Sequence, residues 1–123
     1  MLSFHCRETV CGCAKILSAK SWHTSLLDPE SFPTKEISGT GFYTYAICWG
    51  LNNGVLDKAT YLPIVVKGWQ VMVGAIQQDG KLGFIQPIGA APDLVNENAT
   101  EAYGIGSPHI GKRTSIKVVN NSN

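Results

Sequence analysis

The chain has 123 residues, of which 44% are hydrophobic and 15% are charged, and its formal net charge is +1. This balance gives no basic surface of the kind that binds nucleic acid. A chain of this length can bury about two-thirds of its unfolded surface. We therefore expect residues 1–123 to form one globular unit with no nucleic-acid partner.

The N-terminal segment contains neither an export signal nor a recognisable metal site. Residues 1–10 carry charged side chains and lack an apolar core, so we expect no secretion and, by default, a cytoplasmic protein. The cysteines match neither zinc-ligand spacing nor a disulfide framework: Cys6, Cys11, Cys13 and Cys48. Reduced thiols are the favoured interpretation, and the sequence predicts no metal and no cofactor.

An uncharged segment, residues 37–56, is the most informative part of the chain. Residues 38–52 have apolar side chains on nearly every face of a helix, which is typical of an interior helix with neighbours on all sides. A run of about 20 uncharged residues could also cross a bilayer. Its serine, threonine, asparagine and glycine content is too polar for that, so we predict a buried helix and no membrane partner.

A second helix is predicted after Asp57, which can cap its first turn. One apolar stripe follows helical spacing: Leu62, Val65, Val66, Trp69, Val73 and Ile76. A second apolar patch lies on the far side: Ile64, Val71 and Ala75. Asn53–Gly54 is a typical left-handed end for the first helix, so the pattern predicts an antiparallel helical hairpin.

Loops rich in turn-forming residues connect the predicted helices. We expect a rigid loop at 28–34, a turn followed by a short extended segment at 79–87, and a loop at 87–99. The aspartates of these turns have structural explanations. Glu36 and Glu101 are better candidates for a cavity position, although compensation of a helix dipole is the simpler interpretation of both.

Several motifs of the chain, taken together, resemble the C-terminal part of glycoside hydrolase families 88 and 105, the unsaturated glucuronyl and rhamnogalacturonyl hydrolases. The resemblance runs in order from about residue 22 to residue 106, with matching loop lengths. The segments that carry it are SLLDPESFP (25–33), Glu36, SGTGF (38–42), Tyr45–Ala46, WGLNNG (49–54), YLP (61–63), DGKLGF (79–84) and YGIG (103–106).

The resemblance implies an all-α fold in which helical hairpins form part of an (α/α)6 barrel, with short extended segments in the loops. Twelve helices and their connections need at least about 200 residues, so the chain looks like the last third of that barrel. Residues 107–123 depart from the family pattern at Pro108 and Gly111, and we expect them to be a divergent, disordered tail.

The family hydrates the C4=C5 double bond of unsaturated uronic sugars, which pectin or glycosaminoglycan lyases produce, and an aspartate is its general acid/base. The regions that hold this aspartate and its companion acid are absent here, so no catalytic residue is carried over. The resemblance implies a fragment of a hydrolase acting on unsaturated uronide oligosaccharides, without activity on its own. A small helical carbohydrate-binding or protein-interaction module is the alternative.

The chain could contribute one wall of the sugar cleft, where helix N-termini offer donors to a carboxylate. In this interpretation Trp22 is a stacking surface and His23 a donor. The other candidates bind hydroxyls or provide an acid: Ser38, Thr40, Thr100 and Glu101. Because a third of a ring leaves apolar helix flanks uncovered, we also expect self-association or binding of a complementary barrel fragment.

Overall fold

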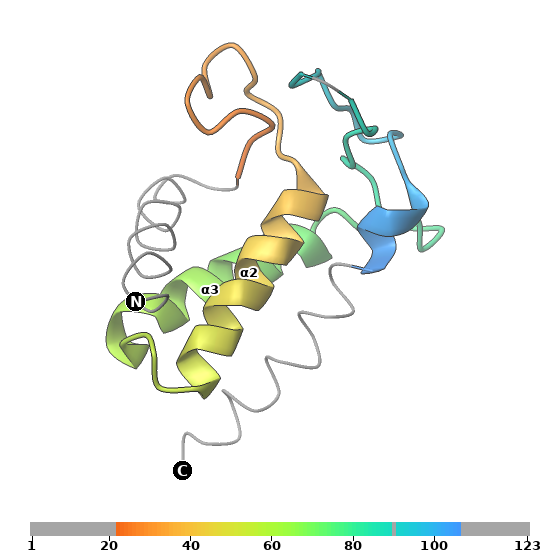
Figure 1. Ribbon diagram of the computed structural model, residues 1–123. Coiled ribbons are helices and arrows are strands. Elements are labelled where there is room, and N and C mark those ends of the chain that lie inside the picture. The colour runs from red at the N-terminus through yellow and green to blue at the C-terminus, as the bar shows by residue number, and fades with distance from the viewer. Residues whose placement is uncertain (1–21, 90, 107–123) are drawn as a thin grey trace.

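The computed structural model describes residues 22–89 and 91–106 of the chain. Its two long helices, α2 (Ile37–Asn52) and α3 (Lys58–Val73), form an antiparallel hairpin, as predicted (Figure 1). The second helix ends three residues earlier than the apolar stripe suggested, and Ile76 instead forms an isolated antiparallel bridge with Leu82. No helix in the described ranges has the length and apolar content needed to cross a membrane. The predicted tail at 107–123 lies outside the described residues.

The turn between the helices follows the sequence signal closely. Gly54 adopts a positive φ of 65°, the left-handed conformation that glycine accepts without steric cost. The next amide, Val55 N, returns to donate to the Gly50 carbonyl at 2.9 Å. A side chain at Gly50 would collide with Leu56, since a Cβ there would lie 2.6 Å from Leu56 Cδ1. The short connection therefore folds back tightly against the end of α2.

Close backbone approach brings α2 and α3 together. A Cβ placed on Gly68 of α3 would lie 2.2 Å from Thr44 Oγ1 of α2, so only glycine fits at this crossing. One buried cluster surrounds the contact and includes Trp22, Ile47, Cys48 and Val65. A second lies nearer the loops: Ile37, Met72, Ala75, Leu82 and Ile85. The hairpin thus has an apolar interior that extends into the segment after α3.

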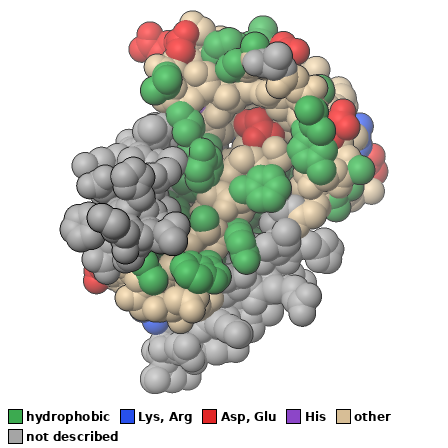
Figure 2. Space-filling view, viewed as in Figure 1, with side chains coloured by type: hydrophobic (Ala, Val, Ile, Leu, Met, Phe, Trp, Pro, Cys, Tyr) green, Lys and Arg blue, Asp and Glu red, His purple; other side chains and the backbone are tan. Residues whose placement is uncertain are grey.

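The helices are not buried on every side. The residue pattern predicted an interior α2 with neighbours on all sides, and α2 differs from that prediction, but the exposed apolar flanks agree with what was expected for a third of a ring. Phe42 and Trp49 are 50% and 49% exposed, and hydrophobic side chains are visible on the face of the molecule that includes α2 (Figure 2). On α3, Val66 and Val73 of the predicted stripe are also about half exposed, whereas Val65 belongs to the buried face. The reason is that α3 is the one long helix packed against α2 among the described residues, and it covers one side.

Two loop segments, 22–36 and 74–101, lie at the end of the hairpin where α2 begins (Figure 1). Glu36 N donates to the Trp22 carbonyl at 3.0 Å, and Ile37 N donates to the Phe84 carbonyl at 2.9 Å. His23 and Lys35 form an isolated antiparallel bridge. The first residues of α2 are therefore held between the two loops, which contain the short extended pieces that the sequence predicted.

Candidate functional site

A pocket of about 280 Å³ lies at the N-terminus of α2, between the two loop segments. Its size is near the lower end of the range for ligand sites, about 300–1,000 Å³, and suits a single sugar ring better than an oligosaccharide. Residues of both loops and of α2 line it: Thr24, Glu36, Ser38, Gln86, Pro87, Ile88, Gly89 and Tyr103. The lining is largely polar, and the described residues that form it include no lysine, arginine or histidine.

Glu36 is the centre of the hydrogen-bond network at this pocket. It is the N-cap residue of α2, and its side chain is 8% exposed. Oε1 accepts from Ser38 N at 3.1 Å, Ser38 Oγ at 2.8 Å and Gln86 N at 3.2 Å. Oε2 accepts from Gly39 N at 2.6 Å. The carboxylate thus satisfies amides of the first helical turn and also complements the positive end of the helix dipole.

The loop after α3 reaches Glu36 because Phe84 turns the backbone. Phe84 has a φ of 59°, an uncommon conformation for a residue with a side chain. Its carbonyl accepts from Ile37 N, and its amide donates to the Asn96 carbonyl at 3.2 Å. The Lys35 ammonium lies 4.4 Å from the centre of its ring, a favourable cation–π contact. The chain then continues in the direction that brings Gln86 N to the carboxylate.

Tyr103 holds the next peptide group of the same loop, because its hydroxyl donates to the Gln86 carbonyl. Gly104 permits this position: a Cβ there would lie 2.4 Å from Ile85 Cδ1, so the chain passes directly over Ile85. Desolvation raises the pKa of the Tyr103 hydroxyl, and the negative charges of Glu36 and Glu101 raise it further. The phenol therefore stays protonated at neutral pH and continues to act as a donor.

Thr24 and Glu36 both retain hydrogen-bonding capacity at the pocket. Thr24 Oγ1 is buried and has no hydrogen-bond partner among the described residues. Glu36 Oε2 accepts one hydrogen bond, from Gly39 N, while a carboxylate oxygen has about two acceptor sites. A ligand hydroxyl, which both donates and accepts, matches what these groups lack.

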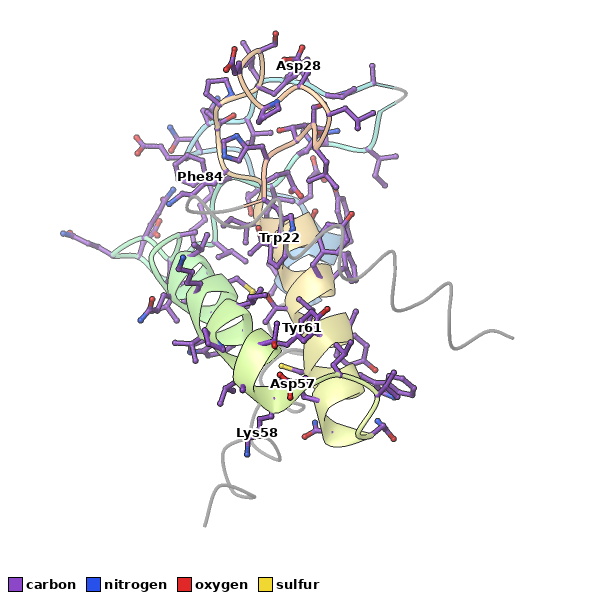
Figure 3. The ribbon with its side chains drawn as sticks, turned by 90° about the vertical axis from the view of Figure 1, so that its left-hand side faces the viewer. Trp22, Asp28, Asp57, Lys58, Tyr61 and Phe84 are labelled. Atoms are coloured by element: carbon purple, nitrogen blue, oxygen red, sulfur yellow. The ribbon has the colours of Figure 1, made fainter. Side chains whose placement is uncertain are left out.

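The residues predicted to bind substrate are only partly brought together here. Ser38 lines the pocket, where its hydroxyl donates to Glu36. Trp22 is 1% exposed and packs 5.1 Å from the Tyr43 ring, measured between centroids, so it presents no surface for stacking a sugar. Figure 3 shows Trp22 beside the start of α2, whereas Asp28 lies at the far tip of its loop. His23 is half-buried, with Nδ1 3.0 Å from the Phe32 carbonyl, and does not line the pocket.

The remaining predicted binding residues also lie outside the pocket lining. Thr40 is completely buried, and its hydroxyl donates to the Glu36 carbonyl at 2.6 Å. Thr100 is exposed on the loop, and Glu101 is half-buried beside Tyr103. Thr40 is thus engaged within the helix start in this structure, while Glu101 acts on the pocket through its charge on Tyr103.

The predicted role of helix N-terminal donors in binding a carboxylate is wrong for α2. Ile37 N donates to Phe84, and the amides of Ser38 and Gly39 donate to Glu36. The chain therefore supplies its own carboxylate to this helix end, and these three donors are occupied.

Sequence reasoning recognised Glu36 as a candidate for a cavity but did not find Gln86 or Tyr103. Gln86 contributes its backbone amide and its backbone carbonyl to these hydrogen bonds, and no residue type marks such a role. A signal for Tyr103 was present in the YGIG segment. Its second residue, Gly104, marks a close backbone approach, which places the neighbouring side chain.

The sequence profile of glycosyl hydrolase family 88 matches residues 5–109, which is most of the chain and includes every residue of the pocket. The chain belongs to glycosyl hydrolase family 88. The family resemblance seen in the sequence motifs is confirmed.

Curated relatives of this family 88 chain include two enzymes named unsaturated 3S-rhamnoglycuronyl hydrolase. The one from Formosa agariphila is 43% identical over 86 residues, and the one from an Alteromonas species is 41% identical over 86 residues. Each alignment covers 70% of this chain but only 23% and 21% of the relatives. The chain thus spans less than a quarter of the length of these enzymes.

Solved structures agree on the fold. A glycosyl hydrolase of family 88 from Bacteroides vulgatus matches with a TM-score of 0.76 and 38% identity, over 85% of this chain and 31% of its own. A polysaccharide lyase matches with a TM-score of 0.78 and 38% identity, over 87% of this chain and 32% of its own. The family 88 chain is an all-helical fragment that corresponds to about a third of these (α/α) barrel structures, which confirms the predicted fold class.

Proposed function

We propose that this chain forms part of the saccharide-binding end of a hydrolase acting on unsaturated uronide oligosaccharides. The observation that carries the proposal is the 43% identity to an unsaturated 3S-rhamnoglycuronyl hydrolase. The pocket at the start of α2 supports it, because a polar cavity for one sugar ring lies between loops that α2 holds in place.

Within this proposal the chain binds saccharide but does not hydrolyse it alone. General acid/base catalysis typically contributes about 10² to 10⁴ in rate. Glu36, the acid at the pocket, accepts four hydrogen bonds from the chain itself, which gives it a structural role as the cap of α2 and the partner of the Gln86 amide. The catalytic aspartate implied by the family resemblance has no counterpart in the motifs of residues 22–106.

The test combines binding with turnover for the chain of 123 residues. An unsaturated rhamnoglycuronyl disaccharide is titrated by ligand-observed NMR, and loss of absorbance from its conjugated double bond reports hydrolysis. We expect saturable binding without turnover. Absence of binding at millimolar ligand overturns the proposal. Turnover that disappears in Glu36→Gln or Glu101→Gln would show that the chain carries its own acid, so the non-catalytic assignment would be wrong.

The exposed apolar face of α2 is, in this proposal, a surface that the remaining helices of the barrel cover. Phe42, Ala46 and Trp49 are all exposed and follow helical spacing on one face. Contiguous apolar patches of more than a few hundred Å² are rare on monomers and usually mark contacts. We therefore expect the chain by itself to associate at micromolar concentration. Light scattering that gives a monodisperse monomer, with no binding of an apolar dye, would contradict this.

A further inference from the structure

We infer that the pocket at the start of α2 binds the hydroxyl groups of an uncharged sugar ring, with Glu36 as their acceptor, and rejects the uronate carboxylate. The inference rests on the proposed function and assigns the part of the saccharide that this pocket recognises. An adjacent neutral residue of the oligosaccharide is its natural occupant, while the uronate binds elsewhere.

Charge excludes an anion from this pocket. Among the described residues, the lining contains one charged side chain, the carboxylate of Glu36, and no cationic side chain. The amides of α2 that would receive an anion already donate to Glu36 and Phe84. A second carboxylate would therefore lie against a like charge without any donor to compensate it. A neutral hydroxyl meets no such repulsion.

The unused hydrogen-bonding positions are complementary to a diol. Glu36 Oε2 can accept from one hydroxyl, because Gly39 N is its one partner in the described structure. Ser38 Oγ donates to Glu36 and keeps acceptor capacity of its own. Thr24 Oγ1 is buried without a partner among the described residues, an arrangement that is unfavourable until a ligand group supplies one. Neighbouring sugar hydroxyls can supply both a donor and an acceptor to this wall.

The rim adds an apolar surface of the kind that the carbon–hydrogen face of a sugar contacts. Pro87 and Ile88 line the pocket, and Ile88 is 88% exposed although it is hydrophobic. The backbone of Gln86 just before them is held at two consecutive peptide groups, since its amide donates to Glu36 and its carbonyl accepts from Tyr103. The apolar rim therefore stands at a defined position relative to the carboxylate.

Two monosaccharides distinguish a pocket for neutral sugar hydroxyls from a pocket for a carboxylate. Rhamnose is the uncharged probe and glucuronate the anionic probe, and each is titrated into the ¹⁵N-labelled chain at millimolar concentration. We expect rhamnose to shift the amide resonances of Gly39 and Gln86, which donate to Glu36, and glucuronate to leave them unchanged. Shifts of these amides by glucuronate, without shifts by rhamnose, would overturn the inference.

The Glu36→Gln variant then gives opposite signs for the two ligand types. If Glu36 accepts from sugar hydroxyls and repels anions, rhamnose binding weakens at least fivefold, while any glucuronate binding strengthens because the like charge is removed. Unchanged or tighter rhamnose binding, or glucuronate binding that weakens, would overturn the inference. Glu30→Gln is the matched control, because Glu30 is exposed on the loop outside the pocket, and we expect no change in either affinity.

Thr24→Val keeps the inference testable if Glu36→Gln does not fold. Valine has the same shape as threonine, and the hydroxyl that it removes has no partner among the described residues, so the fold should be preserved. We expect rhamnose binding to weaken at least threefold, and unchanged binding would count against the inference.

If the unsaturated disaccharide binds while rhamnose does not shift the pocket amides, this inference fails and the proposed function stands. If no saccharide binds, both fail.

Discussion

The helical hairpin and the loop-built end at the start of α2 are held together in different ways. In the hairpin, apolar side chains and a close backbone crossing at Gly68 and Thr44 make the contacts. At the loop-built end, hydrogen bonds to one buried carboxylate join segments 50 residues apart in the sequence. The fold of the hairpin and the shape of the pocket therefore depend on different contacts and can be perturbed separately.

The two helix N-termini show the same contrast on a smaller scale. Asp57 caps α3 from an exposed position, and its carboxylate accepts from the first turn of the same helix, from Thr60 N at 2.8 Å and Thr60 Oγ1 at 2.6 Å. Glu36 caps α2 from a buried position and also holds Gln86 of a distant loop. One cap is local, whereas the other connects the helix to the pocket.

Glu36→Ala should produce the largest effect on stability. It leaves the amides of Ser38, Gly39 and Gln86 without an acceptor, and a buried unsatisfied donor costs about 1–3 kcal/mol. Because some of these amides will find water, we expect the free energy of unfolding to fall by about 3–5 kcal/mol in total. Urea unfolding followed by circular dichroism measures it.

Asp57→Ala is the control for Glu36→Ala, since it removes a cap of the same kind from an exposed site. We expect a clearly smaller decrease in the free energy of unfolding, measured in the same way, because water can replace the lost acceptor at an exposed site. Equal losses for the two variants would mean that the connection from Glu36 to the loop contributes nothing, and the contrast between the caps would have to be abandoned.

Gly68→Ala should have the next largest effect, and it acts on the hairpin alone. The added Cβ lies 2.2 Å from Thr44 Oγ1 unless the helices move apart. Overpacking of this kind costs about 1–3 kcal/mol. Thr44→Ala in the same chain removes the clashing hydroxyl, so the double variant should recover part of the loss. If Gly68→Ala is as stable as the original chain, the crossing is not as close as described.

These contacts also explain what the sequence could and could not predict. The hairpin depends on local signals, namely the Asn53–Gly54 turn and the Asp57 cap, and it was predicted nearly to its bounds. Which face of α3 is buried was not predicted, because Val65 and Val66 have the same apolar character, whereas the buried face is the one on which Gly68 closely approaches Thr44. The residue pattern of the hairpin likewise does not predict which segments pack against it.

The pocket was predicted less well, because its key interactions involve backbone groups and distant segments. The role of Glu36 at the start of α2 depends on neighbouring residues alone, and its compensation of the helix dipole was predicted. Its bond to the Gln86 amide follows from the positive φ of Phe84, and phenylalanine is not a residue that signals such a turn. Trp22, which looked like a stacking residue in a loop, is instead buried beside Tyr43.

Thr40→Val tests whether the Thr40 hydroxyl at the start of α2 stabilises the helix or binds saccharide. The Thr40 hydroxyl is buried and donates to the Glu36 carbonyl, and it does not line the pocket. We expect a loss of about 1 kcal/mol in the free energy of unfolding, the typical contribution of one such hydrogen bond, and unchanged saccharide binding. Weakened binding with unchanged stability would place this hydroxyl in the sugar site after all.

The smallest expected effect concerns the local cap and its response to acid. Hydrogen bonds from the Thr60 side chain and then the Thr60 amide lower the pKa of Asp57 below its ordinary value. A carboxyl whose pKa is lower in the folded state stabilises the fold above the unfolded pKa, which is about 4, and this stabilisation is lost as pH falls through the folded value.

Asparagine also caps helices well but does not titrate, so Asp57→Asn should cap α3 about as well as the original chain near neutral pH. We therefore expect the Tm of the original chain to fall more steeply than that of Asp57→Asn between pH 5 and pH 3, by a few degrees at most, while the other acids titrate in both chains and cancel in the difference. A difference in Tm that stays constant across this range would show that Asp57 holds the helix start equally well in both protonation states, and the cap of α3 would then depend on geometry without any contribution from charge.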